Sequence, residues 1–353
     1  MEFVKQSVVR NGRPDATARA ARAAQALAGG PMRRLVKRFP RLKREARTLL
    51  QRTRARAYRI RRRLRPSSKI AGSARARLGV YVAYFDAAEI YRLHLAAFRQ
   101  TCSGAFNYYV MKNCTTAQEA HRFDAIVSEF GFPRVFTPWP ALVPFSHDES
   151  LQRMVDRTSD EIIVVCDVDT FPIAPGWDDF VVRELATKDA VGALVHIPER
   201  TGLRTILHPC FLAFRRSFLE AHKLDVLRRG DGDPCYRITE WLIENGRFHE
   251  GCVTPLLPTA HEMELFPGFT HPPVFGSRNL RHGLGTTYGD LVLHLWFWRI
   301  IARRRPVRRA DGSVLVGVEQ MEHVLESLRS KLGGTESAPS APSPGRPPAP
   351  RSA

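Results

Sequence analysis

Between residues 78 and 166, short apolar runs alternate with longer segments in which apolar positions recur every three or four residues. The runs are rich in Val, Ile, Tyr and Phe, which favour strands, whereas the recurring positions indicate amphipathic helices. The pattern predicts strands at 78–85, 106–111, 134–136 and 161–166, and helices at 87–101, 116–130 and 148–157. Because the crossover between two parallel strands places a helix on the sheet, we expect an α/β fold with a mostly parallel sheet and helices on both faces.

The pattern becomes less regular after residue 189. It predicts strands at 190–196 and 210–215, a helix at 234–245, and a short amphipathic helix built on Val318, Met321, Leu325, Leu328 and Leu332. The segment 78–310 is long enough for one large domain or two small ones, and we expect one. The amphipathic helix lies within 311–332, and the Pro/Ser/Ala-rich tail at 333–353 lacks the apolar residues that a core needs.

The charge is concentrated at the start of the chain. The protein has 54 Lys and Arg against 35 Asp and Glu, for a net charge of +19. Residues 1–78 hold 24 of the basic side chains and three acidic ones, so the rest of the chain is close to neutral. We expect residues 1–77 to form a basic arm, disordered over 1–31 and able to become helical over 32–65, where apolar residues are sparse among the arginines.

A basic arm of this kind binds polyanions, and three interpretations remain open. Anionic lipid would attract each nearby Lys or Arg by about 1 kcal/mol, so residues 32–65 could hold the protein at the inner face of the plasma membrane. Nucleic acid would rely on the same counterion release, although the arm lacks interleaved aromatic residues and any known RNA- or DNA-binding motif. The third interpretation is a solvated extension without a partner.

The six cysteines form no CxxC pair and no close Cys/His group, which disfavours a disulfide scaffold and a structural zinc site. The first residues lack the apolar stretch of a secretory signal, and the longest apolar run, at 291–302, is interrupted by His294 and Arg299. We therefore expect a cytoplasmic protein without a membrane span.

The sharpest chemical feature is the acidic pair Asp167-Val168-Asp169, directly after the most apolar predicted strand. Residues i and i+2 of a strand point to the same side, so both carboxylates should emerge together at the carboxyl end of a parallel strand, where ligands bind in open α/β sheets. Two oxygen ligands suit Mg²⁺ or Mn²⁺ bridging a diphosphate. The alternative is that one Asp caps the following turn and the other is solvated.

The segment SHDESLQRMVDRTSDEIIVVCDVDTFPI, at 146–173, resembles the nucleotide-binding region of GT-A glycosyltransferases, in particular family-2-like bacterial enzymes that use nucleotide-diphosphate sugars. In that pattern a His-bearing turn opens a helix, a polar turn follows, and an apolar strand ends in an aspartate pair. Further blocks resemble the family in the same order: LGVYVAYFD, HPCFLAFRRSFL, GDPCYRITEWLIENG and LVLHLWF. The resemblance implies a GT-A, Rossmann-like fold over 78–310.

The resemblance also implies roles for the acidic pair and for a late histidine. Asp167 would contact the ribose or a metal-bound water, and Asp169 would ligate Mn²⁺ or Mg²⁺ directly. We include Asp167 in the metal site as well as in the nucleotide-sugar site. His294 would supply a third metal ligand or touch the pyrophosphate, and its alternative is a histidine satisfied inside an apolar strand.

Asp233 matches the position of the general base in inverting members of the family, where it would deprotonate the acceptor hydroxyl. The alternative for Asp233 is a helix cap, because Asp followed by Pro is a common helix start. Asp231 and Glu240 are substitutes for the base.

The resemblance further implies nucleotide-sugar contacts at Ala83, Tyr84, Asn113 and His147. His147 precedes a helix whose amino-terminal amides would face phosphate, and Ser146 has the alternative role of capping that helix. The chain departs from the family at Lys112, where an acidic residue usually reads the base or ribose.

Together these features predict a metal-dependent, inverting hexosyltransferase of polysaccharide biosynthesis. It would transfer sugar from a nucleotide-diphosphate sugar to a glycan, a lipid-linked acceptor or another hydroxyl. A nucleotidyltransferase shares the sheet and the acidic pair but normally has a Gly-rich, basic loop after its first strand, which this chain lacks. A nucleic-acid-binding protein with an inactive α/β body is the alternative from another class.

Overall fold

A computed structural model describes the central part of the chain. The described residues are 58, 77–138, 144–199, 202–228, 233–261, 285–295, 307–308, 314–316, 322, 325–326 and 328–330. Residues 1–66 and 67–353 are separate units, and the architecture below is that of the second unit. Apart from Tyr58 and Arg77, the predicted basic arm lies outside the described residues, as does the tail at 333–353.

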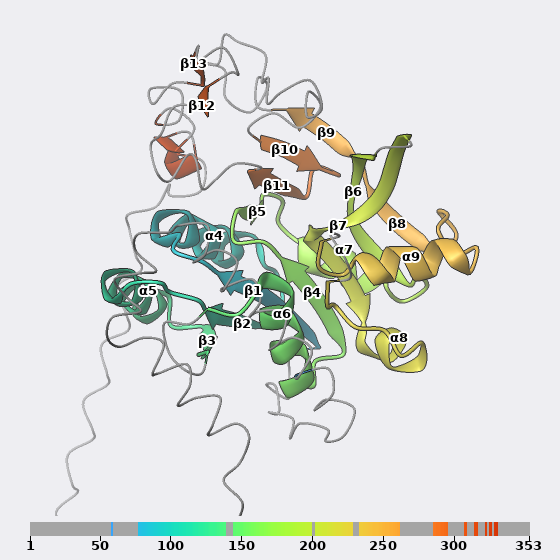
Figure 1. The fold of residues 1–353 in the computed structure, drawn as a ribbon, viewed down its shortest axis with the longest axis horizontal. Helices are drawn as coiled ribbons and strands as arrows, with labels where there is room; N and C mark the ends of the chain where they lie inside the picture. Colours follow the sequence, from blue (N-terminus) through green and yellow to red (C-terminus); the bar gives the residue numbers. More distant parts are fainter. Residues whose placement is uncertain are drawn as a thin grey trace, which may run out of the picture. The chain divides into compact units, whose positions relative to one another are not determined.

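The central sheet of the described region has seven strands in the order β3-β2-β1-β4-β7-β6-β8 (Figure 1). The strands are β1 (Leu78–Tyr84), β2 (Phe106–Lys112), β3 (Pro133–Phe136), β4 (Ile162–Cys166), β6 (Ala190–Glu199), β7 (Gly202–Arg215) and β8 (Val253–Leu256). Six of them run in one direction, and β7 is antiparallel to both of its neighbours, β4 and β6. The predicted mostly parallel α/β sheet is confirmed.

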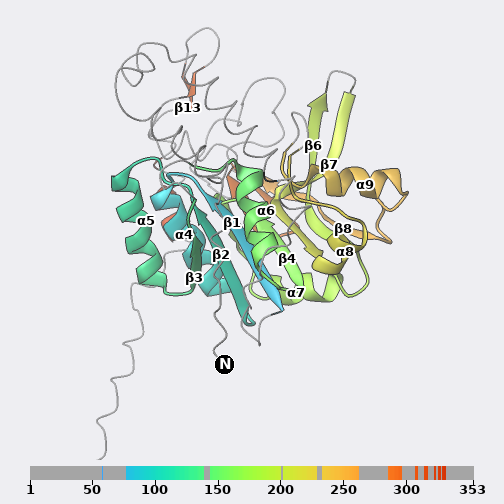
Figure 2. The same cartoon turned by 60° about the horizontal axis from the view of Figure 1, so that its bottom comes forward.

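Helices cover both faces of this sheet, as Figure 2 shows. One face packs against α4 (Ala88–Thr101), α5 (Ala117–Phe130) and α7 (Trp177–Glu184), and the other against α6 (His147–Arg157), α8 (Arg216–Ala221) and α9 (Tyr236–Glu244). The strands alternate between two cores because successive side chains point to opposite faces. In β4, Val164 and Cys166 belong to the first core, whereas Ile163 and Val165 belong to the second.

A second, antiparallel sheet follows the end of β4. Its strands, in spatial order, are β5 (Thr170–Pro172), β11 (Val292–Leu295), β10 (Gly285–Tyr288) and β9 (Pro258–His261). A separate two-stranded sheet joins β12 (Val307–Arg308) and β13 (Val314–Val316). Because β5 begins one residue after Asp169 and pairs with β11, this sheet brings a late segment of the chain to the acidic pair.

Most predicted elements before residue 166 agree with the structure to within a residue or two. The helix expected from 234 begins later, at Tyr236, and the strand expected at 210–215 is the end of the longer β7. In the amphipathic segment at 311–332, residues 322, 325–326 and 328–330 are helical, and Leu325 and Leu328 are buried in the first core. Among the described residues, no helix combines the length and the apolar character needed to cross a bilayer.

Candidate metal and nucleotide site

The acidic pair lies in a tight turn at the carboxyl end of β4. Asp167 donates its backbone N–H to the carbonyl of Cys210 at 3.0 Å, and Thr170 donates its N–H to the carbonyl of Asp167 at 3.1 Å. The imidazole Nδ1 of His94, on α4, lies 2.6 Å from the carbonyl oxygen of Thr170. The carboxylates therefore belong to the turn after the strand, and contacts from β7 and α4 hold that turn on both sides.

Strand β11 carries His294 to this turn. His294 pairs with Thr170 across the two strands, and Leu295 donates its N–H to the carbonyl of Asp169 at 2.9 Å. As a result, His294 Nε2 lies 3.5 Å from Asp169 Oδ1 and 4.0 Å from Asp167 Oδ2. The side chain of Asp167 is 19% exposed, whereas those of Asp169 and His294 are buried.

The donor atoms of these three residues fit one divalent cation. One ligand atom from each lies within 4.8 Å of the other two. Ligand atoms bound to one octahedral cation are about 3 Å apart, so a small contraction would bring the three together. Burial lowers the pKa of His294 to about 4, against the opposing effect of Asp167, so its imidazole is neutral near pH 7 and has a lone pair for a metal. Carboxylate oxygens with one imidazole suit Mn²⁺ well.

The amino end of α6 faces the same carboxylates. Ser146 caps this helix by accepting a hydrogen bond from the N–H of Glu149 at 3.4 Å, so the capping role considered for Ser146 is confirmed. His147 is the first helical residue, and its Nε2 lies 3.2 Å from Asp167 Oδ1. The structure thus brings together His147, Asp167, Asp169 and His294, the last of which is more than a hundred positions from the others in sequence.

Asp233 lies before α9 and is not its cap. The helix begins at Tyr236 after Cys235, whose φ of 62° is in the left-handed region, so the interpretation of Asp233 as a helix cap is wrong. The Asp233 carboxylate is 48% exposed, and its Oδ2 lies 3.7 Å from Nε2 of His208 on β7. The ring of His208 is 5.9 Å from the ring of His294, so Asp233 approaches the metal-binding group through His208.

Of the two substitutes for Asp233, Glu240 belongs to the described part of the chain. Glu240 lies on α9, 3.7 Å from the guanidinium of Arg237, and Asp231 lies outside the described residues. Sequence reasoning missed His208, because the only local signal is a histidine before a proline in a strand.

The predicted nucleotide contacts Ala83, Tyr84 and Asn113 are buried at the carboxyl ends of β1 and β2. Tyr84 donates its hydroxyl to Glu119 Oε1 at 2.5 Å, and burial raises the pKa of that hydroxyl. Asn113 donates its amide to Ser150 Oγ and accepts the N–H of Phe145, each at 2.9 Å. Tyr84 and Asn113 therefore bond within the fold, and the Asn113 side chain holds the loop before α6.

Lys112, which stands where the family has an acidic residue, forms an ion pair with Asp124 of α5 at 2.6 Å. Next to it in space, Asp86 has a φ of 44° and accepts the N–H of Thr115 at 2.9 Å as well as its hydroxyl. Asp86 thus joins the loops that follow β1 and β2.

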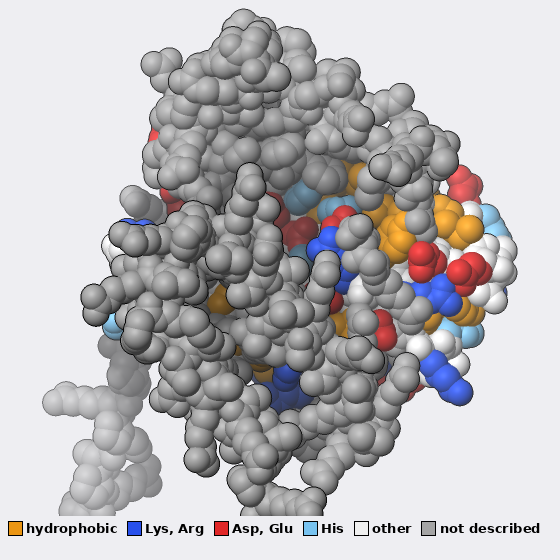
Figure 3. Space-filling model, in the orientation of Figure 1, with side chains coloured by type: hydrophobic (Ala, Val, Ile, Leu, Met, Phe, Trp, Pro, Cys, Tyr) orange, Lys and Arg blue, Asp and Glu red, His pale blue; other side chains and the backbone are white. Residues whose placement is uncertain are grey.

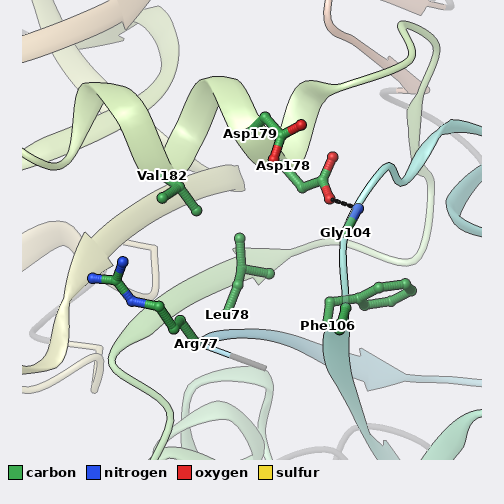
Figure 4. Close-up of a pocket in the computed structure, with 8 residues that line it drawn as sticks. Arg77, Leu78, Gly104, Phe106, Asp178, Asp179 and Val182 are labelled. Carbon is green, nitrogen blue, oxygen red and sulfur yellow. Dashed lines mark hydrogen bonds between the residues drawn. The ribbon is translucent and has the colours of Figure 1, made fainter. Parts of the chain in front are cut away.

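Two cavities in the described region lie away from the acidic pair. The one in Figure 4, of about 140 Å³, lies where β1 and β2 begin, at the opposite edge of the sheet. There Asp178 of α7 accepts the N–H of Gly104 at 2.7 Å and that of Ser103 at 3.1 Å, which ties α7 to the loop before β2. The other, of about 210 Å³, is lined by Tyr109, Arg134, Val135, Phe136, Thr137 and Arg157 at the edge strand β3.

In the space-filling view of Figure 3, acidic and histidine side chains lie side by side near the centre of the visible face.

No protein-family model matches the chain, and no curated protein matches it. Among solved structures, the chain is similar to the mannosyltransferase PcManGT of Pyrobaculum calidifontis, solved in complex with GDP-Man and Mn²⁺. The two align at 17% identity and a TM-score of 0.34, over 50% of this chain and 56% of the mannosyltransferase. Glucosyl-3-phosphoglycerate synthase of Mycobacterium tuberculosis aligns at 15% identity and a TM-score of 0.35, over 55% of this chain and 78% of the synthase.

A third solved structure is similar to the same extent. The 4-diphosphocytidyl-2C-methyl-D-erythritol synthase of Anaerococcus prevotii aligns at 8% identity and a TM-score of 0.35, over 51% of this chain and 86% of the synthase. The chain spans little more than half the length of the mannosyltransferase.

Proposed function

We propose that the protein is a metal-dependent glycosyltransferase of the GT-A type that transfers a hexosyl group from a nucleotide-diphosphate sugar to a hydroxyl acceptor. The observation that carries the proposal is the convergence of Asp167, Asp169 and His294 at the carboxyl ends of the parallel strands. This edge is where open α/β sheets bind nucleotides. The amino end of α6 lies beside it, where backbone N–H groups favour phosphate.

Asp167, Asp169 and His294 would hold Mn²⁺ or Mg²⁺, which when bound neutralises negative charge on the departing diphosphate. His147 would donate a hydrogen bond to the diphosphate from its place beside Asp167, 3.2 Å away. The loops after β1 and β2, with Ala83, Tyr84 and Asn113, would position the nucleoside. These roles follow from the position of each residue at the same edge of the sheet.

Asp233 would act as the general base. Its carboxylate is half exposed and faces His208, so an acceptor hydroxyl can reach it from solvent. In this role Asp233 accepts the hydroxyl proton while the acceptor oxygen attacks the anomeric carbon on the side opposite the diphosphate, which inverts the configuration. We further propose a glycan or lipid-linked acceptor, as in polysaccharide biosynthesis. Residues 32–65 would hold the enzyme at the anionic inner face of the plasma membrane.

Calorimetric titration of the full chain with UDP and GDP, each with and without Mn²⁺, tests the donor site. We expect one nucleotide to bind in the presence of Mn²⁺, and Asp169→Asn to weaken that binding at least about tenfold, or about 1.4 kcal/mol. The matched control is Asp179→Asn, because Asp179 accepts a hydrogen bond from Ser103 at the opposite edge of the sheet. Metal-independent binding that is unchanged in Asp169→Asn would refute the metal site.

The reaction is tested with UDP-glucose, UDP-galactose and GDP-mannose in the presence of Mn²⁺. We expect release of the nucleoside diphosphate from one of them, lost in Asp169→Asn and reduced in Asp233→Asn. A nucleotidyltransferase would instead release pyrophosphate from a nucleoside triphosphate and a sugar 1-phosphate, so the two product assays separate the two enzyme classes. The anomeric configuration of the product, read by NMR, tests inversion.

A further inference from the structure

The bulge in β7 orients His208 toward Asp233. Along β6, the consecutive residues Gly192 and Ala193 pair with Leu212 and His208, so residues 209–211 have no partner on β6. Bulges of this kind bend a strand and re-aim its side chains, and they are frequent beside active sites. Pro209, which has no N–H to contribute to a sheet, lies within the bulge. The bulge is next to the end of β4, where Phe211 pairs with Cys166.

The hydrogen bond to Nδ1 determines the tautomer of His208. Cys210 donates its backbone N–H to His208 Nδ1 at 3.1 Å, so this nitrogen must offer a lone pair. In a neutral imidazole the proton then lies on Nε2, the nitrogen that is 3.7 Å from Asp233 Oδ2. The carbonyl of the same Cys210 accepts the N–H of Asp167 at 3.0 Å. One peptide segment therefore orients His208 and holds the first residue of the acidic pair.

We propose that His208 is a positioning residue that orients the Asp233 carboxylate for deprotonation of the acceptor, an inference that rests on the proposed function. Its Nε2–H lies toward Asp233 Oδ2, to which it donates in the reacting complex, and leaves Oδ1 for the acceptor proton. In the transfer step, that proton moves to Oδ1 as the acceptor oxygen bonds to the anomeric carbon. The bond from this carbon to the diphosphate breaks, and its electron pair leaves with the diphosphate.

His208 and Asp233 differ in how far their side chains are buried, and this difference suits their different roles. The His208 side chain is 11% exposed and the Asp233 side chain 48%, so an acceptor can reach the carboxylate while the imidazole stays shielded from water. A hydrogen bond from a side chain that is shielded from water to a charged group is stronger than the same bond in water. The separation of 3.7 Å is longer than a hydrogen bond, as is common in enzymes without substrate, and it must shorten in the reacting complex.

Nitrogen-15 NMR of histidine-labelled full-length protein tests the pairing without any substrate. The His208 signals are assigned by their absence in His208→Gln. We expect the proton on Nε2, an unprotonated Nδ1, and a shift of the Nε2 signal in Asp233→Asn. A proton on Nδ1, or a His208 spectrum unchanged by Asp233→Asn, would overturn the inference.

Steady-state kinetics tests the role in transfer, with Mn²⁺ and whichever of UDP-glucose, UDP-galactose and GDP-mannose is turned over. We expect His208→Phe to lower kcat about ten- to a hundredfold, the effect of losing one hydrogen bond to a charged group, with KM for the sugar nucleotide changed less than about twofold. His208→Gln, which keeps an N–H donor at similar reach, should recover most of the rate. In an Asp233→Asn background, His208→Phe should cause no further loss, because the two residues act as one unit.

His121→Gln is the matched control, since His121 is exposed on α5. Unchanged kcat in both His208 variants would refute the positioning role. A wild-type protein that turns over none of the three sugar nucleotides would count against the proposed function, and the NMR experiment would still decide whether His208 and Asp233 are paired. The two failures are therefore distinguishable.

Discussion

A shift to mildly acidic pH should destabilise the protein through His94. This histidine is fully buried among aromatic rings, with Phe98 at 4.7 Å and Tyr108 at 5.8 Å between ring centroids. Its Nδ1 donates to the carbonyl of Thr170, and its Nε2 has no hydrogen-bond partner within the described part of the chain. A second proton would have to sit on Nε2, where no described group accepts it. Burial accordingly lowers the pKa of His94 to about 3.

The size of the loss in the free energy of unfolding follows from proton linkage. The pKa of His94 is about 6.5 in the unfolded chain and about 3 in the folded protein. Protonation therefore favours the unfolded state, and the contribution to stability is complete above pH 6.5 and is lost as the pH falls toward 3. Between pH 7 and pH 5 the loss is about 2 kcal/mol. His294, with a pKa of about 4, adds a loss of the same sign and of about the same size over this interval.

Urea unfolding at pH 7 and pH 5, followed by tryptophan fluorescence, measures this loss. His94→Asn keeps an N–H near the Nδ1 position and removes the titratable ring, so we expect it to lose about 2 kcal/mol less than the wild type over this interval, whatever its stability at pH 7. The exposed His121→Asn is the control and should behave as the wild type. If His94→Asn and the wild type lose the same free energy of unfolding, the reasoning is wrong.

Two further changes test the packing at the amino ends of β1 and β4. Asp160 is buried and accepts hydrogen bonds from Tyr81 at 2.7 Å and Asn107 at 2.6 Å. In urea titrations we therefore expect Asp160→Ala to lower the free energy of unfolding by about 3–5 kcal/mol. Asp160→Asn should lower it by less. A Cβ on Gly79 would lie 2.7 Å from Cγ of Asp160. We therefore expect Gly79→Ala to cost about 1–3 kcal/mol in the same assay, and an unchanged unfolding midpoint would contradict this.

Periodicity predicted the first half of the described fold well, because each β/α unit there is long enough to show its pattern. The second, antiparallel sheet was hardly predictable. Its strands have three or four residues, too few to establish alternation, and β5 pairs with β11 across more than a hundred positions of sequence. Helix α7 was missed because it is short and Asp178 and Asp179 make its first turn look like a loop. The reversed direction of β7 has no local signal either.

Residues of the candidate site could be predicted where their signal lies within a short stretch of sequence. The acidic pair is visible from residues 167–169 alone. His294 was suggested by resemblance, and its contact with Asp169 depends on the pairing of β5 with β11. Asp233 was suggested by resemblance, and the structure removes its alternative role as a cap. His208 could not be found, because what sets it apart is a strand bulge and a neighbour 25 positions away in sequence.

The position of the acidic pair is set by backbone hydrogen bonds from three parts of the fold. The turn is bound by the carbonyl of Cys210 on β7, by the N–H of Leu295 on β11 and by the imidazole of His94 on α4. None of these three contacts uses a carboxylate oxygen, so the turn is held through its backbone alone. Two carboxylates held this close repel each other, and a cation between them would relieve that repulsion. In the proposed metal site, the same architecture would favour binding of a cation, because backbone bonds formed on folding already hold the turn that carries the two carboxylates.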